Sequence, residues 1–186
     1  MSPRPVRIRI PPEPSSDKTP KAVSWVARYP SLARRLLLLM FEIPQGRLRR
    51  RVLAWFVREV AAGSFNRMDF DVIRAALPDD FELRPSPEMN SLLGHHSEVY
   101  SSKDEALGFL VDWFEAWESF RLIPTEMIDL GERKVLLLNR ATGRGAGSGL
   151  AIDQHESELW EFRPDRARMK QWWNWEDGLA AVGLKE

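Results

Sequence analysis

The second half of the chain constrains the fold most, because four strand candidates follow one another directly there. Each combines apolar and polar alternation with aromatic or β-branched residues. Their approximate ranges are 120–129, 134–142, 150–162 and 168–175. Residues 131–133 and 164–166 are typical of tight turns, and the glycine-rich run 144–149 joins the second strand to the third. Connections this short predict antiparallel neighbours in one sheet.

Helices are predicted before these strands. A helix should run from about residue 47 to 62, with Gly63 as its stop signal, and a short helix over 70–77 should follow an Asp69 N-cap. A third helix over 102–118 begins with Ser102 and Glu105 in capping-box spacing.

Between the second and third helices the sequence predicts a short strand over 81–84 and a loop over 85–97. A tail helix over 176–184 closes the chain. Helices first and antiparallel strands afterwards indicate the α+β class. We expect a cone-shaped α+β barrel, in which a curved mixed or antiparallel sheet wraps around three N-terminal helices and encloses a cavity.

The N-terminal third differs from the rest in charge. The chain is neutral overall, but residues 1–58 carry a net charge of +10 and the remainder −10. Residues 1–20, rich in proline and serine, are predicted to be a disordered leader, and residues 21–46 a basic amphipathic extension broken at Pro30. This region could contact an anionic surface, or fold back on the acidic body of the domain, residues 47–184.

Several classes of site are excluded. The chain has no cysteine, so disulfides, thiolate metal sites and thiol nucleophiles are ruled out. It contains no dinucleotide or nucleotide fingerprint, no metalloprotease motif and no serine-hydrolase elbow, and the adjacent His95 and His96 diverge on an extended backbone. We therefore expect no cofactor and no metal. The first residues show no secretory signal, so a cytoplasmic location is expected.

An ordered set of motifs over about 47–184 resembles the SnoaL-like domain family of the nuclear-transport-factor-like (NTF2-like) and ketosteroid-isomerase-like superfamily. The motifs are the run 66–71, Pro78-Asp79-Asp80-Phe81-Glu82, the run 100–106, the late hairpin 143–162 and the tail 178–184. Met68 stands where the family usually has glycine. The resemblance implies a cone with a pocket, and the superfamily includes isomerases, cyclases, dehydratases and non-catalytic domains.

The enolising isomerases of this superfamily use a carboxylate base, a helix-1 tyrosine and a neutral carboxylic acid. Glu158 lies near the position of that acid. The base position holds Arg84 and Pro85, and the two tyrosines of the chain, Tyr29 and Tyr100, lie outside helix 1. This argues against steroid-isomerase chemistry.

Alternation along the strand 150–162 separates two faces. One face holds Glu156, Glu158, Trp160 and Phe162; the other holds Asp153, His155, Ser157 and Leu159. The aromatic residues favour the first face as the inner one. Glu158 is the candidate catalytic residue. The candidate ligand-binding residues are Phe56, Trp113, Trp117, Glu156, Trp160, Trp172 and Asn174.

Two functions remain open from the sequence. The first is a pocket protein for a small apolar or polycyclic ligand, with an isomerase, cyclase or dehydratase reaction by acid–base catalysis. The second is a non-catalytic domain that binds ligands or proteins and dimerises through the outer sheet face. For the tryptophans, core packing is the alternative to ligand contact, and for Asn174 the alternative is the start of the tail helix.

Overall fold

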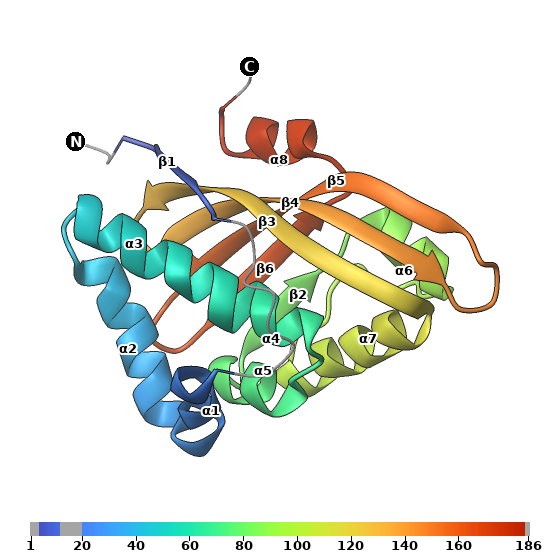
Figure 1. Ribbon diagram of the computed structural model, residues 1–186, viewed down its shortest axis with the longest axis horizontal. Coiled ribbons are helices and arrows are strands. Elements are labelled where there is room, and N and C mark those ends of the chain that lie inside the picture. The colour runs from blue at the N-terminus through green and yellow to red at the C-terminus, as the bar shows by residue number, and fades with distance from the viewer. Residues whose placement is uncertain (1–3, 12–19, 185–186) are drawn as a thin grey trace.

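The computed structural model describes residues 4–11 and 20–184, and it is built on one six-stranded sheet (Figure 1). The strand order is β1-β3-β4-β5-β6-β2. The strands span Val6–Arg9 (β1), Phe81–Arg84 (β2), Trp117–Gly131 (β3), Lys134–Gly145 (β4), Ala151–Phe162 (β5) and Ala167–Trp172 (β6). β1 and β3 to β6 pair antiparallel, and β2 joins β6 in parallel, so the sheet is mixed.

Helices precede the long strands, as the sequence predicts. They are α1 (Lys21–Arg28), α2 (Pro30–Glu42), α3 (Arg47–Trp55), the π-helical segment η1 (Phe56–Ala62), α4 (Gly63–Asn66), α5 (Phe70–Ala76), α6 (Pro87–Leu93), α7 (Lys103–Glu115) and α8 (Trp175–Ala181). Most of them gather on one side of the sheet, while α8 lies on the other side (Figure 1). The α+β cone predicted from the sequence is confirmed.

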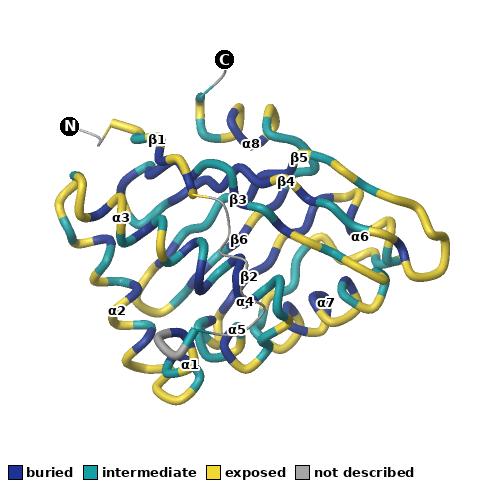
Figure 2. The backbone as a smooth tube through the Cα atoms, viewed as in Figure 1, coloured by how far each residue is buried: buried dark blue, intermediate teal, exposed yellow. Residues whose placement is uncertain are grey.

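Alternating residues of β3 and β4 separate the two sides of the sheet. Met127, Val135 and Leu137 belong to the main core with the helices, whereas Leu136 and Leu138 pack with Leu179 of α8. β3 also shifts register against β4 at three places, and such bulges increase twist and bend a sheet. The backbone is buried through the centre of this wall and exposed at the β4–β5 connection (Figure 2).

Two segments predicted to lack structure are ordered. The leader prediction over 1–20 was wrong for Val6–Arg9, which pairs with β3 and buries Ile8; residues 1–3 and 12–19 lie outside the described residues. The loop prediction over 85–97 was wrong for α6. Its signals were present: the Ser86 hydroxyl accepts a bond from the Met89 amide, Pro87 starts the helix and Gly94 ends it at φ 68°.

The helix predicted to stop at Gly63 continues to Asn66. Gly63 has a helical φ of −63°, and a Cβ placed there would lie 2.7 Å from the carbonyl oxygen of Arg58, five residues earlier. The wide π turn thus brings backbone close to Gly63, which explains a glycine inside the helix rather than at its end.

Two predicted N-caps differ in detail. The Ser102 hydroxyl accepts from the Glu105 amide at 3.2 Å and Glu105 reaches back to the Ser101 amide at 2.7 Å, which confirms the capping box. Asp69 occupies the N-cap of α5 but makes no side-chain cap hydrogen bond. Its carboxylate accepts from the Arg67 Nε at 3.0 Å instead.

One buried ion pair fastens the N-terminal helices to the sheet. Arg49 of α3 donates from Nε and Nη2 to the two carboxylate oxygens of Asp129 on β3, at 2.7 and 2.8 Å. Its Nη1 also donates to the carbonyls of Phe41 and Ile43 at the end of α2. Asp129 accepts a further bond from the Gly131 amide at 3.1 Å. One guanidinium therefore joins α2, α3 and the β3–β4 turn.

Replacing Arg49 with methionine should destabilise the fold by about 3–5 kcal/mol, because it leaves the Asp129 carboxylate buried without its partner. The measurement is the free energy of unfolding in urea. The neighbouring exposed Arg50 is the matched control, since Arg50→Met should change stability by less than about 0.5 kcal/mol. Equal losses in the two variants would contradict the role given to Arg49.

Met68→Gly should stabilise the protein by about 0.5–1 kcal/mol. Met68 has a φ of 55°, a left-handed conformation that disfavours any side chain with a Cβ. This is the position where the resembling family usually has glycine. Met68→Ala is the control, because alanine keeps the strained Cβ and should give no gain in thermal unfolding. A gain of the same size with alanine would assign the effect to the exposed methionine side chain instead.

Candidate functional site

A cavity of about 110 Å³ lies between the helices and the concave side of the sheet. Helices α2 to α5 and α7 supply one wall, and β2 to β6 supply the other. Nearly all lining side chains are apolar; representatives from each wall are Leu37, Phe56, Val60, Met127, Leu137 and Trp160. A space of this size holds several waters or part of a small organic molecule.

Among the described residues that line the cavity, three carry side-chain oxygens. They are Asn139 of β4, Glu158 of β5 and Gln171 of β6. Glu158 pairs directly with Gln171, and Asn139 pairs with Glu156, two residues earlier on β5. Glu158 is the single titratable group in that lining, and it is 5% exposed. The cavity is therefore an apolar chamber with one polar patch on its sheet wall.

Glu158 is held from two sides. Its Oε2 accepts from the Trp160 indole Nε1 at 2.8 Å, and its Oε1 accepts from the Gln171 amide at 3.4 Å. Trp160 itself stacks on Phe81 at 5.9 Å and on Phe162 at 5.8 Å between ring centroids. These contacts fix the carboxyl group at the cavity surface.

A second glutamate lies beside the first. Glu156, two residues earlier on the same strand, accepts from the Asn139 amide at 3.2 Å and is fully enclosed. Burial, together with the charge of Glu158, raises the pKa of Glu156 to about 8, although the bond from Asn139 opposes the rise. Burial also raises the pKa of Glu158, against the bonds from Trp160 and Gln171.

Asn139 and Gln171 donate hydrogen bonds to the two glutamates through their side-chain nitrogens, but their side-chain oxygens have no donor in the described part of the chain. Asn139 Oδ1 and Gln171 Oε1 are buried and accept no hydrogen bond from the described residues. Both residues line the cavity. A ligand with a hydroxyl or amine donor would satisfy them, because a buried acceptor without a donor is unfavourable.

The structure brings together three of the residues expected at the site. Phe56, Glu158 and Trp160 line the cavity, and Glu156 is buried next to its wall. The inner and outer faces of β5 are as predicted, since His155 stacks on Trp175 of α8 at 4.1 Å, on the outer side.

The other expected ligand contacts lie elsewhere. Trp113 and Trp117 pack in an aromatic core cluster at 5.2 Å from each other, outside the cavity lining. Trp172 pairs with Ser157 and packs under α8 on the outer face, with Lys170 Nζ 5.0 Å from its ring centre. Strand alternation explains this, because inward Gln171 forces its neighbour outward.

Asn174 is also outside the cavity, where it caps α8. Its side-chain oxygen accepts from the Asp177 amide at 2.7 Å, which is the start-of-helix alternative considered from the sequence. Gly178 lets this helix lie close to the sheet, since a Cβ there would come within 2.1 Å of the Ser157 hydroxyl. α8 thus covers part of the outer face of the sheet, the face through which the sequence predicts dimerisation. Dimerisation through the rest of this face stays a prediction.

Sequence reasoning missed four lining residues that matter. Asn139 follows an apolar run in the buried strand β4. A polar side chain is unfavourable in such a strand unless it has a hydrogen-bond partner, so Asn139 could have indicated a polar group at the cavity wall. Gln171 alternates with Met169 on β6 and could have been found in the same way. Leu37 and Phe41 come from α2, in the extension that the sequence placed outside the domain.

The π-helical segment gives the cavity its helical wall. Five of its seven residues, namely Phe56, Val57, Val60, Ala61 and Ala62, line the cavity. Single π turns inside α-helices are rare and are frequently found at functional sites.

No group of three or more metal-ligating side chains occurs in the part of the chain that the structure describes. His95 is used otherwise: its ring nitrogens contact the Tyr100 hydroxyl at 2.8 Å and the Asp112 carboxylate at 3.2 Å. Within the same described part, no helix has the length and apolar character needed to cross a bilayer.

The fold is shared with solved structures. An NTF2-like protein of unknown function from Burkholderia pseudomallei superposes with a TM-score of 0.54 at 21% identity, over 67% of this chain and 91% of that one. TerC, co-crystallised with polyporic acid, has a TM-score of 0.53 at 18% identity, and the match covers 67% of this chain and 92% of TerC. A protein with a ketosteroid-isomerase-like fold from Catenulispora acidiphila, in complex with trimethylamine, has a TM-score of 0.50 at 13% identity. That match covers 72% of this chain and 92% of the other.

These similarities show that the chain has the NTF2-like, ketosteroid-isomerase-like fold expected from its motifs. A scan against protein-family models and a search of curated proteins gave no match. At these identities the likeness is one of fold, and the chemistry has to be argued from the cavity itself.

Stability should fall as the pH rises from about 4.5 to about 8, because Glu156 is protonated in the fold over a range in which the unfolded chain ionises it. Below pH 4.5 its contribution is fully present, and it is lost as the pH passes through the folded value. Urea unfolding at a series of pH values measures this. Glu156→Gln should weaken the dependence and leave the part due to Glu158, whose pKa burial also raises, whereas the exposed Glu118→Gln should retain it in full. A dependence unchanged by Glu156→Gln would contradict the assignment.

Proposed function

We propose that this chain, with its NTF2-like fold, binds a small apolar or polycyclic molecule that carries a carbonyl group beside a hydroxyl. The carrying observation is Glu158, a buried carboxyl group with a raised pKa at the surface of an apolar cavity. In its neutral form it can donate a hydrogen bond to a carbonyl oxygen. An ionised ligand would find no cation among the described lining residues.

The adjacent amides complete the recognition. The unused acceptors Asn139 Oδ1 and Gln171 Oε1 suit a ligand hydroxyl next to that carbonyl. The stacked Trp160, Phe81 and Phe162 favour a flat ring system against the sheet wall. The TerC structure, which shares the fold, was co-crystallised with polyporic acid and supports the use of this fold for a small organic ligand.

Acid–base chemistry at Glu158 would use one group for both proton steps. As a neutral acid it protonates the carbonyl oxygen of a ketone, and the resulting carboxylate removes a proton from the adjacent carbon, which gives the enol. The reverse steps return the proton to carbon. No other titratable side chain lies in the described lining, so a reaction of this kind is an isomerisation, cyclisation or dehydration rather than hydrolysis with a separate base.

A second candidate function is ligand binding without turnover. It is favoured by Arg84, which stands on β2 where the enolising isomerases have their carboxylate base and therefore supplies no base. The Arg84 Nε forms an ion pair with the Glu82 carboxylate at 2.7 Å. The two candidates differ in deuterium exchange. A catalyst accelerates incorporation of deuterium into the acetyl methyl group of 2-acetylnaphthalene in heavy water, and Glu158→Gln abolishes the acceleration; a pure binding protein shows saturable binding without exchange.

Wild-type protein should bind 2-acetylnaphthalene about ten times more tightly than 2-ethylnaphthalene, which has a similar shape and no carbonyl. Glu158→Leu should remove this preference by lowering affinity for the ketone alone. Quenching of tryptophan fluorescence measures both affinities, because Trp160 lines the cavity. The control is Asp153→Asn on the outer face, which should keep the preference. Equal affinities for the two probes in the wild type would refute the role of Glu158.

A further inference from the structure

The outer surface of α2 and α3 is unusually apolar. Six of the ten exposed large hydrophobic residues in the described chain fall within residues 29–55. They are Tyr29, Leu32, Leu36, Leu39, Leu48 and Trp55. Leu39 and Leu48 are 57% and 64% exposed, so the helices do not use these side chains for packing within the chain.

The apolar surface of α2 is wider than its buried stripe. Ala33, Leu37 and Phe41 face inward and are buried, while Leu32, Leu36 and Leu39 recur at three- and four-residue steps beside them and are exposed. A helix that only covered the cavity would need the inner stripe alone. The outer stripe therefore requires a separate explanation.

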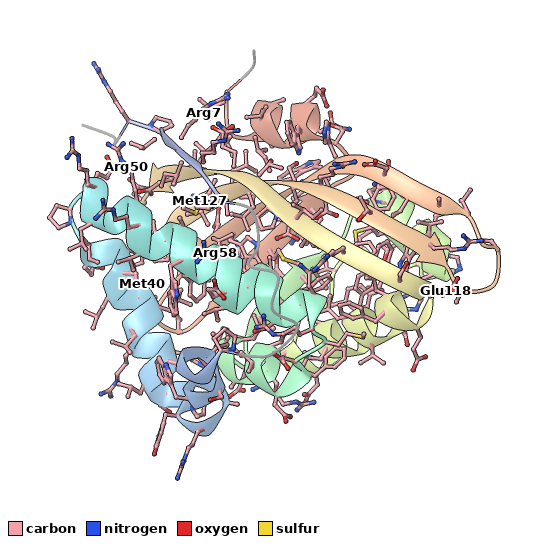
Figure 3. The ribbon with its side chains drawn as sticks, viewed as in Figure 1. Arg7, Met40, Arg50, Arg58, Glu118 and Met127 are labelled. Atoms are coloured by element: carbon pink, nitrogen blue, oxygen red, sulfur yellow. The ribbon has the colours of Figure 1, made fainter. Side chains whose placement is uncertain are left out.

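Arginines border this outer stripe. Arg28, Arg35, Arg47, Arg50 and Arg51 are all exposed, and none of them forms an ion pair with another described residue. On α3, Arg51 lies one turn from both Leu48 and Trp55. Arg50 is seen near the start of α3 and Met40 where α2 approaches α3 (Figure 3). Arg49, which lies between Arg47 and Arg50, is buried and forms the ion pair with Asp129 instead.

The exposed stripe continues into a groove. Leu36 and Met40 of α2, Trp25 of α1 and Trp55 of α3 line a second hollow between these helices. This hollow and the main cavity share four residues, Leu37, Phe56, Val60 and Ala76, so one layer of side chains separates them. Leu36 and Trp55 thus belong both to the exposed apolar surface and to the hollow that borders the cavity wall.

We propose that the α2–α3 face, formed by Leu32, Leu36, Leu39, Leu48 and Trp55 with the surrounding arginines, docks on an anionic phospholipid surface. Exposed leucines and a tryptophan enter the interface between headgroups and acyl chains, and guanidinium groups meet lipid phosphates. Each arginine near an anionic membrane contributes about 1 kcal/mol, so four or five give useful affinity.

Other occupants fit less well. A second copy of the chain would bring arginines against arginines, which opposes self-association through this face. A nucleic acid would match the charge but leave the leucines in water, since its backbone offers them no apolar surface. A lipid surface satisfies both the charge and the apolar stripe.

Co-sedimentation with vesicles tests the proposal on the full chain. Wild-type protein should bind vesicles with about a quarter phosphatidylglycerol and bind phosphatidylcholine vesicles at least tenfold more weakly, with binding reduced by salt. The double variant Leu32→Ser, Leu39→Ser should lose at least tenfold in binding to the anionic vesicles. The variant Arg35→Gln, Arg51→Gln should lose binding to a similar extent.

Matched controls distinguish docking from general stickiness. Leu92 and Leu150 are exposed leucines elsewhere on the surface, so Leu92→Ser, Leu150→Ser should bind as the wild type does. Circular dichroism confirms that each variant is folded. Binding of 2-acetylnaphthalene should be unchanged in the Leu32, Leu39 variant, so failure of docking and failure of the proposed ligand function are separate results.

Three outcomes would overturn the proposal. One is a lack of specific binding to anionic vesicles, seen either as no binding of the wild type or as an equal loss in the control variant. Another is binding of a DNA oligonucleotide that depends on Arg35 and Arg51 and not on the leucines. The third is a concentration-dependent dimer in light scattering that Leu32→Ser, Leu39→Ser dissociates, which would assign the stripe to a second copy.

Discussion

The buried pair between Arg49 and Asp129 is the contact on which the site depends. It fixes the start of α3 to the sheet and, through the carbonyls of Phe41 and Ile43, the end of α2. Those helices are the walls and cover of the cavity. A charge pair of this kind adds little stability compared with an apolar pair, but its two parallel hydrogen bonds fix the position of α3 against β3. The helices are therefore held at a distance from the sheet that leaves a hollow.

That hollow decides the chemistry of Glu158. In water its carboxyl group would be ionised at neutral pH, but enclosure by apolar walls raises its pKa and that of Glu156. The same enclosure makes each hydrogen bond at the site stronger and each missing bond more unfavourable. A carboxyl group with a raised pKa and two amides with unused acceptors, Asn139 and Gln171, are the polar groups of the sheet wall that the proposed ligand would have to match.

α2 connects the two proposals made for this protein. Its inner residues Leu37 and Phe41 belong to the cavity, and its outer residues Leu32, Leu36 and Leu39 form the exposed stripe. A helix whose apolar surface is wider than its buried stripe can separate a ligand chamber from an apolar environment outside. In the two proposals, this one helix faces the ligand chamber with its inner residues and the lipid surface with its outer residues.

The sequence by itself determined that helices precede four consecutive strands. It also determined the faces of β5, because period-two alternation places Glu158 and Trp160 on one side whatever else the chain does. It did not determine which tryptophans meet the cavity. Trp172 and Trp113 are aromatic at the expected spacing, yet one lies under α8 and the other in the core. Only the tertiary structure decided this, because α8 docks over Trp172 and the aromatic core closes around Trp113. The pair of Arg49 with Asp129, 80 positions away, likewise joins segments that no local pattern relates.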